Sequence, residues 1–258
     1  MCDLFNSREL AGKIAFRGGT AIHKLLFRQP LRYSEDIDLV QIQAEAIGST
    51  VDAIRDTLSW LSKCSRTHAG HSMHLVFKFA PEADTETTLK LKVEINTREH
   101  ECLYGVRKYP FEVDSRWYRA KTEISSFEPE ELFATKLRAL LQRRKGRDLF
   151  DLYEGLKQLS LDTGKLITCF EHYLALEGNS ITRALAEQRM LEKLTRNLTD
   201  DIAPLLPTSI TFTENDAIQS FNKVWSELIT RITGDPWKLT NKVVEELRQK
   251  KHPNLLSD

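Results

Sequence analysis

The sequence lacks three features that would point to particular classes of protein. Its four cysteines form no Cys-x-x-Cys pair, which argues against a disulfide framework or a zinc ribbon and favours free thiols in a reducing cytoplasm. No apolar run approaches the roughly 20 residues that cross a bilayer, and the N-terminus lacks a signal-peptide pattern, so we expect no membrane partner. The chain has 37 basic and 37 acidic residues. This balance argues against general electrostatic coating of nucleic acid but permits a local basic patch.

Two halves of the 258-residue chain differ in the period of their apolar residues. In the first half, residues 88–96 alternate like a strand, whereas residues 49–63 repeat apolar side chains at helical spacing. In the second half helices are expected over residues 132–147, 147–160, 163–176, 181–198, 214–232 and 236–251. We therefore predict an α+β protein, with a mixed sheet and flanking helices over residues 1–126 and an all-helical domain over residues 127–258.

The segment from Phe16 to Val40 carries the strongest chemical signal. A strand-like run ends at Gly18-Gly19, and a helix is expected to start through Thr20. Two glycines let the backbone approach a bulky anion, and the N–H groups of the following helix point toward it. This pattern predicts that Gly18, Gly19 and Thr20 bind a nucleotide.

The same segment ends in Asp36-Ile37-Asp38. On a strand the two carboxylates share one face while Ile37 points into the core. Two hard oxygen ligands on one face suit Mg²⁺, which completes its shell with water and substrate phosphates. A Gly-Gly turn alone is often only a turn, and Asp-x-Asp alone is often a solvated strand end. Their combination predicts a nucleotidyltransferase that uses an NTP and Mg²⁺ held by Asp36 and Asp38.

Two further residues are expected to border this site. Glu94 alternates with the apolar positions of its strand, so it is a candidate third carboxylate, either as a metal ligand or as a base. The alternative is that Glu94 only pairs with Lys90 or Lys92. Ser34 lies two residues before Asp36, so on an extended strand it shares the carboxylate face, and a phosphate there would compete for the metal. The alternative for Ser34 is a hydroxyl that caps the entry to the strand.

The segment 132–147 carries six basic residues and no acid. At helical spacing Lys136, Arg143 and Arg147 fall along one side, and such an edge can neutralise a triphosphate or an RNA backbone. Lys136 is expected to matter more for NTP use than Arg144. The alternative is an ordinary solvated face, although such faces usually include acids. Asp148 and Asp151 follow at i, i+3, where the simplest interpretations are a helix-start acid and a surface charge.

Together these segments resemble the AbiEii/AbiGii-type toxin family, which includes the MenT toxins of mycobacteria, within the DNA-polymerase-β-like nucleotidyltransferase superfamily. The resemblance spans about residues 13–155. The matching motifs are Phe16-Arg17-Gly18-Gly19-Thr20-Ala21, Arg32-Tyr33-Ser34-Glu35-Asp36-Ile37-Asp38-Leu39, Val93-Glu94-Ile95-Asn96, Lys136-Leu137-Arg138-Ala139 and Arg147-Asp148-Leu149-Phe150-Asp151-Leu152.

The resemblance implies a type IV-like toxin–antitoxin system. The toxin would transfer NMP from an NTP, in some members to the 3′ end of tRNA, which blocks translation, and a cognate antitoxin would restrain it. It further implies that Lys136 contacts the nucleotide phosphates and that Asp148 acts near the reaction centre. Residues 1–126 would then be the catalytic domain, and residues 127–258 would complete the cleft for nucleotide and acceptor.

Such proteins usually carry more N-terminal helix before the Gly-Gly turn, which this chain reaches after seventeen residues. We therefore expect a truncated or misassigned N-terminus, with part of the support for the nucleotide pocket missing.

Two other functions fit the same residues. One is a nucleotidyltransferase whose acceptor is a small-molecule hydroxyl or a protein side chain rather than RNA. The other is a non-catalytic module that senses a nucleotide or binds a protein. Retention of Asp36, Asp38, Glu94 and Lys136 argues against the second, because a site without activity would tolerate their loss.

Overall fold

The computed structural model describes residues 1–34, 36–61, 63–81, 84, 86–143, 145–195 and 198–257. The chain divides into two compact units. Unit 1 comprises residues 1–30 and 34–128, and unit 2 comprises residues 31–33 and 129–258. The short segment 31–33 therefore belongs to unit 2, although its neighbours along the chain belong to unit 1.

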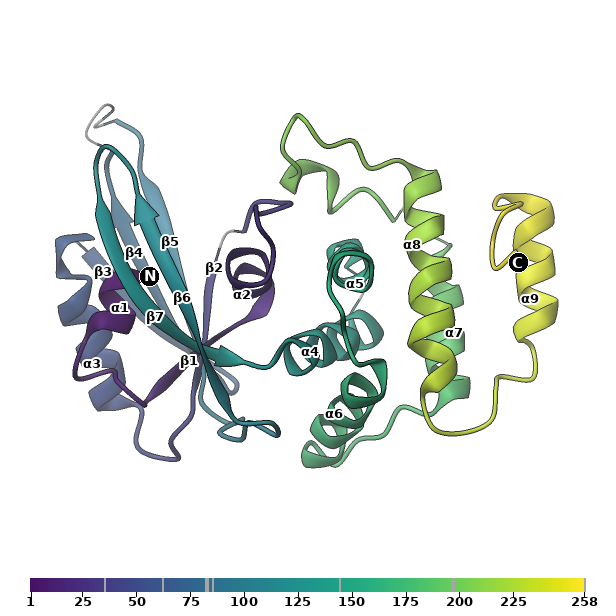
Figure 1. Ribbon diagram of the computed structural model, residues 1–258, viewed down its shortest axis with the longest axis horizontal. Coiled ribbons are helices and arrows are strands. Elements are labelled where there is room, and N and C mark those ends of the chain that lie inside the picture. The colour runs from purple at the N-terminus through teal and green to yellow at the C-terminus, as the bar shows by residue number, and fades with distance from the viewer. Residues whose placement is uncertain are drawn as a thin grey trace. The chain divides into compact units, whose positions relative to one another are not determined.

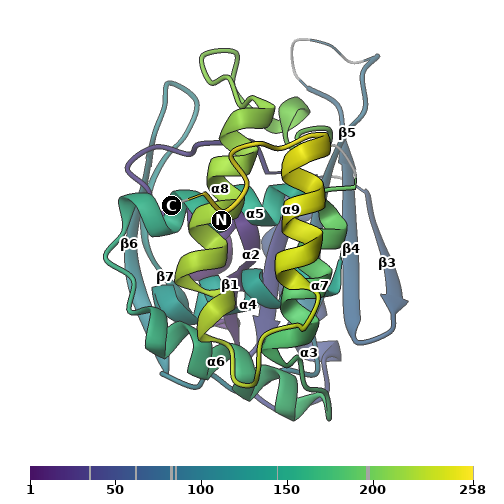
Figure 2. The ribbon, with the colours of Figure 1, turned by 90° about the vertical axis from the view of Figure 1, so that its right-hand side faces the viewer.

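Unit 1 is built on a seven-stranded mixed sheet with the order β3-β4-β5-β2-β1-β7-β6. Figure 2 shows β3 at one edge of this sheet and β6 at the other. The strands are β1 (Ile14–Arg17), β2 (Asp36–Gln41), β3 (Lys63–Ala69), β4 (Ser72–Phe79), β5 (Leu89–Asn96), β6 (Val106–Asp114) and β7 (Arg119–Phe127). The two parallel pairs are β2 with β5 and β1 with β7, and the other pairs are antiparallel.

Three helices flank the sheet (Figure 1). They are α1 (Cys2–Asn6), α2 (Gly18–Leu25) and α3 (Gly48–Thr57), the last followed by the 3₁₀ turn η1 (Ser59–Leu61). Helix α2 packs on β1 and β2, and α1 packs on β7. The apolar residues of the central strands lie in the resulting core, where Phe16, Leu39 and Val93 are fully buried, as expected for strands that are covered by other elements.

Unit 2 contains the helices of the second half of the chain (Figure 1). They are α4 (Pro129–Gln142), α5 (Gly146–Gln158), α6 (Thr163–Leu176), α7 (Arg183–Lys193), α8 (Glu214–Glu227) and α9 (Thr240–Lys250), with the 3₁₀ turns η2 (Ala203–Leu205) and η3 (Ile229–Arg231). Helix α8 begins with a capping box between Thr213 and Asp216, which satisfies N–H groups that have no partner inside the helix. The predicted α+β class is confirmed.

In unit 1 the structure differs most from the prediction over residues 49–69. The helix expected over residues 49–63 ends at Thr57, and residues 63–69 form β3, which the sequence did not predict. Strand β3 is an edge strand whose side chains are mostly exposed. An edge strand with little buried surface needs no alternating apolar pattern, so period-2 analysis could not detect it.

The basic segment 132–147 is not one helix. Helix α4 ends at Gln142 and α5 begins at Gly146. A side chain at Gly146 would place its Cβ 2.2 Å from the carbonyl oxygen of Leu198, so only glycine permits this close approach. Lys136 and Arg147 therefore lie on different helices, and the predicted common edge is wrong.

No helix among the described residues is long and apolar enough to span a bilayer.

Candidate functional site

Gly18 and Gly19 lie directly after β1, where the sequence predicted the turn, and they are the first two residues of α2. Gly18 has φ +78°, a left-handed conformation that glycine adopts without steric cost. A Cβ at Gly18 would lie 2.0 Å from Oδ2 of Asp38. The glycine is therefore needed for a second reason, because it lets the turn approach the carboxylate directly.

A hydrogen bond also joins the start of α2 to the carboxylate strand. Thr20 Oγ1 donates to the backbone carbonyl oxygen of Asp36 at 2.7 Å. Thr20 is almost fully buried, so this bond fixes the first turn of α2 relative to β2. The predicted nucleotide contact of Thr20 would then come from its backbone N–H group rather than its hydroxyl.

Asp36 and Asp38 occupy the same face of β2. Both are partly exposed, whereas Ile37 and Leu39 on the other face are buried, as the alternation of side chains on a strand requires. Because β2 pairs in parallel with β5, Asp36 lies opposite Lys92 and Asp38 lies opposite Glu94. The sheet thus brings the Asp-x-Asp pair and the predicted third carboxylate onto neighbouring strands.

Lys92 also belongs to this group, and its pairing with Glu94, the alternative to a catalytic role for Glu94, is present in the structure. Its Nζ lies 2.8 Å from Oε2 of Glu94 and 3.5 Å from Oδ2 of Asp36. His74, on β4, approaches Glu94 with Nε2 3.4 Å from Oε2. Burial raises the pKa of the Glu94 carboxyl, but the hydrogen bond and charge of Lys92 and the charge of His74 lower it by more, so the net shift is downward. Glu94 is therefore ionised near neutral pH.

The chemistry of these side chains fits a hard cation. Asp36 and Asp38 present carboxylate oxygens from one rigid face, and Mg²⁺ commonly needs no more than two protein carboxylates. The described residues contain no group of three or more His, Cys, Asp or Glu side chains arranged to hold a metal ion. Asp36 and Asp38 would therefore hold a divalent cation only together with water and substrate, and Glu94 as a third metal ligand stays a prediction.

Ser34 lies outside the strand on which its prediction depended. Strand β2 begins at Asp36, and Ser34 is exposed in the segment before it. The alternation of a strand therefore does not place Ser34 on the face of Asp36 and Asp38. Its role near the nucleotide stays a prediction without that geometric support.

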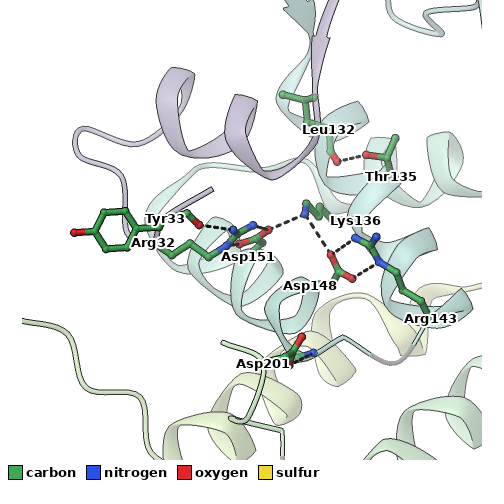
Figure 3. A network of polar contacts seen from close by, with 10 residues as sticks. Arg32, Tyr33, Leu132, Thr135, Lys136, Arg143, Asp148, Asp151 and Asp201 are labelled. Atoms are coloured by element: carbon green, nitrogen blue, oxygen red, sulfur yellow. Dashed lines mark hydrogen bonds and ion pairs between the residues drawn. The ribbon is translucent and has the colours of Figure 1, made fainter. Parts of the chain in front are cut away.

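Unit 2 contains a second group of charged residues, shown in Figure 3. Arg32 binds Asp151 through two bonds of 2.7 Å, from Nε to Oδ1 and from Nη2 to Oδ2. Lys136 Nζ lies 2.8 Å from Oδ2 of Asp151 and 3.2 Å from Oδ1 of Asp148. Arg143 completes the series with bonds of 2.8 and 2.9 Å to Asp148. We call these five residues the buried charge chain after its two buried carboxylates, although the side chain of Arg143 at its end is 46% exposed.

The buried charge chain alternates in sign, which offsets much of the cost of removing charges from water. The side chains of Asp148 and Asp151 are 0% exposed and that of Lys136 is 7% exposed. Burial raises the pKa of the Asp148 carboxyl, but Lys136 and Arg143 lower it by more, so the net shift is downward. Each of the two carboxylates therefore has two cationic partners.

These contacts bear on the interpretations of three residues. Asp148 lies in the first turn of α5, as a helix-start acid does, but it is buried and paired with cations. Asp151 is not a surface charge, because it is buried and pairs with Arg32 and Lys136. The solvated face that was the alternative for Lys136 is excluded, because Lys136 is buried between two carboxylates. Arg144, which was to be compared with Lys136, lies outside the described residues.

Sequence reasoning missed the pairing of Arg32 with Asp151. Arg32 belongs to the segment 31–33 of unit 2, and the next residue, Tyr33, donates its backbone N–H to the carbonyl oxygen of Leu205 at 2.7 Å. The spacing of Asp148 and Asp151 was the available signal, because residues at i, i+3 lie on one helix face and can share a cation.

Comparison with known proteins places the chain in a family. In fold it is similar to MenT4, a nucleotidyltransferase toxin from Mycobacterium tuberculosis, with a TM-score of 0.59, 15% identity, and coverage of 95% of this chain and 84% of that chain. It is also similar to a candidate nucleotidyltransferase from H. pylori, with a TM-score of 0.52, 18% identity, and coverage of 93% and 91%. No curated protein matches the chain. The model of the AbiEii nucleotidyl transferase toxins matches residues 1–227, so the chain belongs to this family of toxins of type IV toxin–antitoxin systems.

Proposed function

We propose that this nucleotidyltransferase toxin transfers NMP from an NTP to an RNA acceptor, the 3′ end of tRNA, and thereby blocks translation. The observation that carries the chemistry is the carboxylate face of β2, where Asp36 and Asp38 lie beside Gly18 and opposite Lys92 and Glu94. A face of this kind can hold a divalent cation and a triphosphate together. Membership of the family implies a cognate antitoxin as a protein partner.

We assign the metal to Asp36 and Asp38, and we take it to be Mg²⁺. When bound, Mg²⁺ would neutralise charge on the phosphates and orient them for displacement. Gly18, Gly19 and Thr20 would bind the phosphates through the backbone at the start of α2, where N–H groups without helical partners favour an anion. Ser34 is proposed to border the nucleotide.

Glu94 is the base in this proposal, and Lys92 supports it. As an ionised carboxylate next to Asp38 it can accept the proton of the attacking hydroxyl. Its ion pair with Lys92 keeps its pKa low, which preserves the ionised form. Lys92 also lies 3.5 Å from Asp36, so it limits the repulsion among three neighbouring carboxylates until a cation binds.

Lys136 and Asp148 keep the roles implied by the motif match, a contact with the nucleotide phosphates and a function near the reaction centre. Their burial supports a structural contribution as well, because Lys136 already bonds to Asp148 and Asp151. Substitution of Lys136 is therefore expected to lower both NTP use and stability. Only kinetic and unfolding measurements on the same variant separate the two contributions.

The RNA acceptor is supported by exposed basic residues near the proposed site in unit 1. Lys90 and Arg98 are exposed at opposite ends of the region around Glu94, and Lys92 lies between Asp36 and Glu94. Basic side chains around an NTP site suit a polyanionic acceptor. An acceptor that is a small neutral hydroxyl compound would gain little from them.

The test is incubation of the protein with total RNA, Mg²⁺ and each labelled NTP in turn. Label should appear on RNA of tRNA size, and transfer should fall with salt by roughly one power of concentration per phosphate neutralised. Label on a small hydroxyl compound or on protein, with none on RNA under any NTP, would establish the second candidate acceptor. Binding of NTP without any transfer would instead support a non-catalytic nucleotide-binding module.

A cellular experiment tests the toxin function independently of the acceptor. Expression of the wild-type chain without an antitoxin should stop growth and protein synthesis. Expression of Asp36→Ala at the same level should not. Growth arrest by both proteins would mean that the toxicity does not depend on the carboxylate face.

A further inference from the structure

Unit 2 contains a pocket of about 230 Å³ whose lining includes none of the residues of the carboxylate face of β2. It is lined by the end of α4, the start of α5, the last part of α7 and the segment 198–201. Its apolar lining consists of Leu140, Leu141, Leu149 and Leu198, all buried. The size and lining suit the flat apolar faces of a small ring system.

The polar part of the lining is mainly cationic. Arg143, Lys145, Arg189 and Lys193 line the pocket together with the acids Glu192 and Asp201. Arg143 is already paired with Asp148, so the other five charged side chains, three positive and two negative, leave a net formal charge of +1. Because Lys145 and Glu192 are exposed, solvent reaches the charged rim while the leucines form the interior.

Two of the cations are oriented by backbone carbonyl groups. Arg189 Nη1 donates to the carbonyl oxygen of Leu141 at 3.2 Å, and Lys193 Nζ donates to that of Arg143 at 2.6 Å. A backbone carbonyl is a neutral acceptor, so these bonds orient the side chains but do not neutralise them. Lys145 forms no ion pair with any residue that the structure describes. The rim is therefore preorganised for an anion.

Asp201 places a hydrogen-bond acceptor in the same pocket. Its Oδ1 accepts the backbone N–H of Gly146 at 2.8 Å, at the start of α5. Its Oδ2 is buried and has no hydrogen-bond partner among the described residues. A buried carboxylate oxygen without a partner costs free energy, and a ligand that carries an N–H or O–H group would remove that cost.

We propose that this pocket binds a nucleoside 5′-phosphate unit. The base lies against the leucines, the phosphate binds at Lys145, Arg189 and Lys193, and a sugar hydroxyl or base N–H donates to Asp201. The unit is either a free nucleotide or one residue of an RNA chain, because both present the same base, sugar and phosphate. This site goes beyond the proposed transfer reaction, since binding there requires neither the metal nor Asp36 and Asp38.

The experiment measures binding by the full chain in EDTA, so that a metal-dependent site does not contribute. One arm titrates unlabelled nucleoside 5′-monophosphates by calorimetry, and the other titrates a fluorescent tetranucleotide RNA by anisotropy. Lys145→Glu reverses an exposed charge of the rim, Glu192→Gln removes an acid from it, and Lys242→Glu reverses an exposed charge on α9 as the matched control.

We expect Lys145→Glu to weaken binding about tenfold, because it replaces a positive charge of the rim with a negative one. Glu192→Gln removes a negative charge and should tighten binding about twofold. Lys242→Glu should have little effect. Such effects on the monophosphate alone identify a free nucleotide as the ligand, and effects on the tetranucleotide alone identify RNA. Equal effects of Lys145→Glu and Lys242→Glu on both probes, or no binding of either probe, overturn the proposal. The outcome is independent of NMP transfer, which is absent in EDTA.

Discussion

The two groups of charged residues in this protein use the same side-chain types in opposite ways. On the sheet of unit 1, Asp36, Glu94 and Lys92 each retain about a third of their side-chain exposure, at 37%, 32% and 33%. In unit 2, Asp148 and Asp151 are fully buried and Lys136 nearly so. The first group is open to a ligand, whereas the second is already neutralised by its own partners.

The difference has an energetic consequence. A solvated ion pair contributes about 0–1 kcal/mol to stability, because water and salt screen it. Removal of one partner from a buried pair costs about 3–5 kcal/mol, because it leaves a charge without water or counter-charge. Substitutions on the carboxylate face should therefore affect activity with little effect on folding, and substitutions in the buried charge chain should affect folding, with Lys136 expected to lower NTP use as well.

The largest effect is expected for the carboxylates of β2. Asp36→Ala and Asp38→Ala each remove a proposed metal ligand from a partly exposed position, so transfer should fall by about a thousandfold or more. The unfolding midpoint should stay close to that of the wild type, because no core cavity opens. Transfer of labelled NMP is measured with Mg²⁺ as the only metal, with Asp52→Ala, an exposed acid of α3, as the control. Full activity of either variant would refute the assignment.

The complementary experiment concerns the buried charge chain. Asp151→Asn leaves Arg32 without its bidentate partner and Lys136 with one carboxylate, so the free energy of unfolding should fall by about 3–5 kcal/mol. Asp235→Asn, at an exposed position of the same unit, should change it by less than about 0.5 kcal/mol. Urea denaturation followed by circular dichroism compares them. A small effect of Asp151→Asn would mean that the buried charge chain contributes no more to stability than the exposed charges of the carboxylate face.

A third experiment uses the pKa of Glu94. In the wild type its pKa is lowered from its ordinary value, because the hydrogen bond and charge of Lys92, together with smaller effects of His74 and Ser72, outweigh the effect of burial. In Lys92→Met the effect of burial is opposed less, so the pKa rises, and the acid side of the pH–rate profile should move to higher pH. Lys90→Met, which alters an exposed lysine of the same strand, should leave the profile unchanged. Superimposable profiles for the two variants would exclude a role for ionised Glu94 in transfer.

The smallest effect is expected on acid stability. The folded-state pKa of Asp148 lies below its ordinary value of 3.8, so its ion pairs stabilise the fold above that pH and the stabilisation is lost as the pH falls through the folded-state pKa. Arg143→Gln weakens this lowering, so acid unfolding should begin at a higher pH, by roughly half a unit or less. Acid titration of the variant beside Lys242→Gln measures the shift. Identical midpoints would show that Arg143 does not lower the pKa of Asp148.

Local geometry made much of the carboxylate face predictable from sequence. Alternation along a strand has a period of two, so Asp36, Ile37 and Asp38 had to face alternate sides once the segment was assigned as a strand. The two glycines marked the end of β1 for a similarly local reason, since Gly18 takes up a left-handed conformation. The length of α3 and the presence of β3 were not predictable in this way, because an exposed edge strand leaves no apolar pattern.

The sequence by itself determined which residues are candidates for the chemistry, because the Gly-Gly turn, the Asp-x-Asp pair and the position of Glu94 on its strand depend on neighbours in the chain. Only the tertiary structure decided which charges are buried. Arg32 and Asp151 are separated by 119 positions and form two hydrogen bonds, and Gly146 interrupts the basic segment because Leu198 approaches it from another part of the fold. Whether a lysine is solvated or neutralised depends on such distant partners. A charge can be buried at low cost only where the fold places an opposite charge beside it.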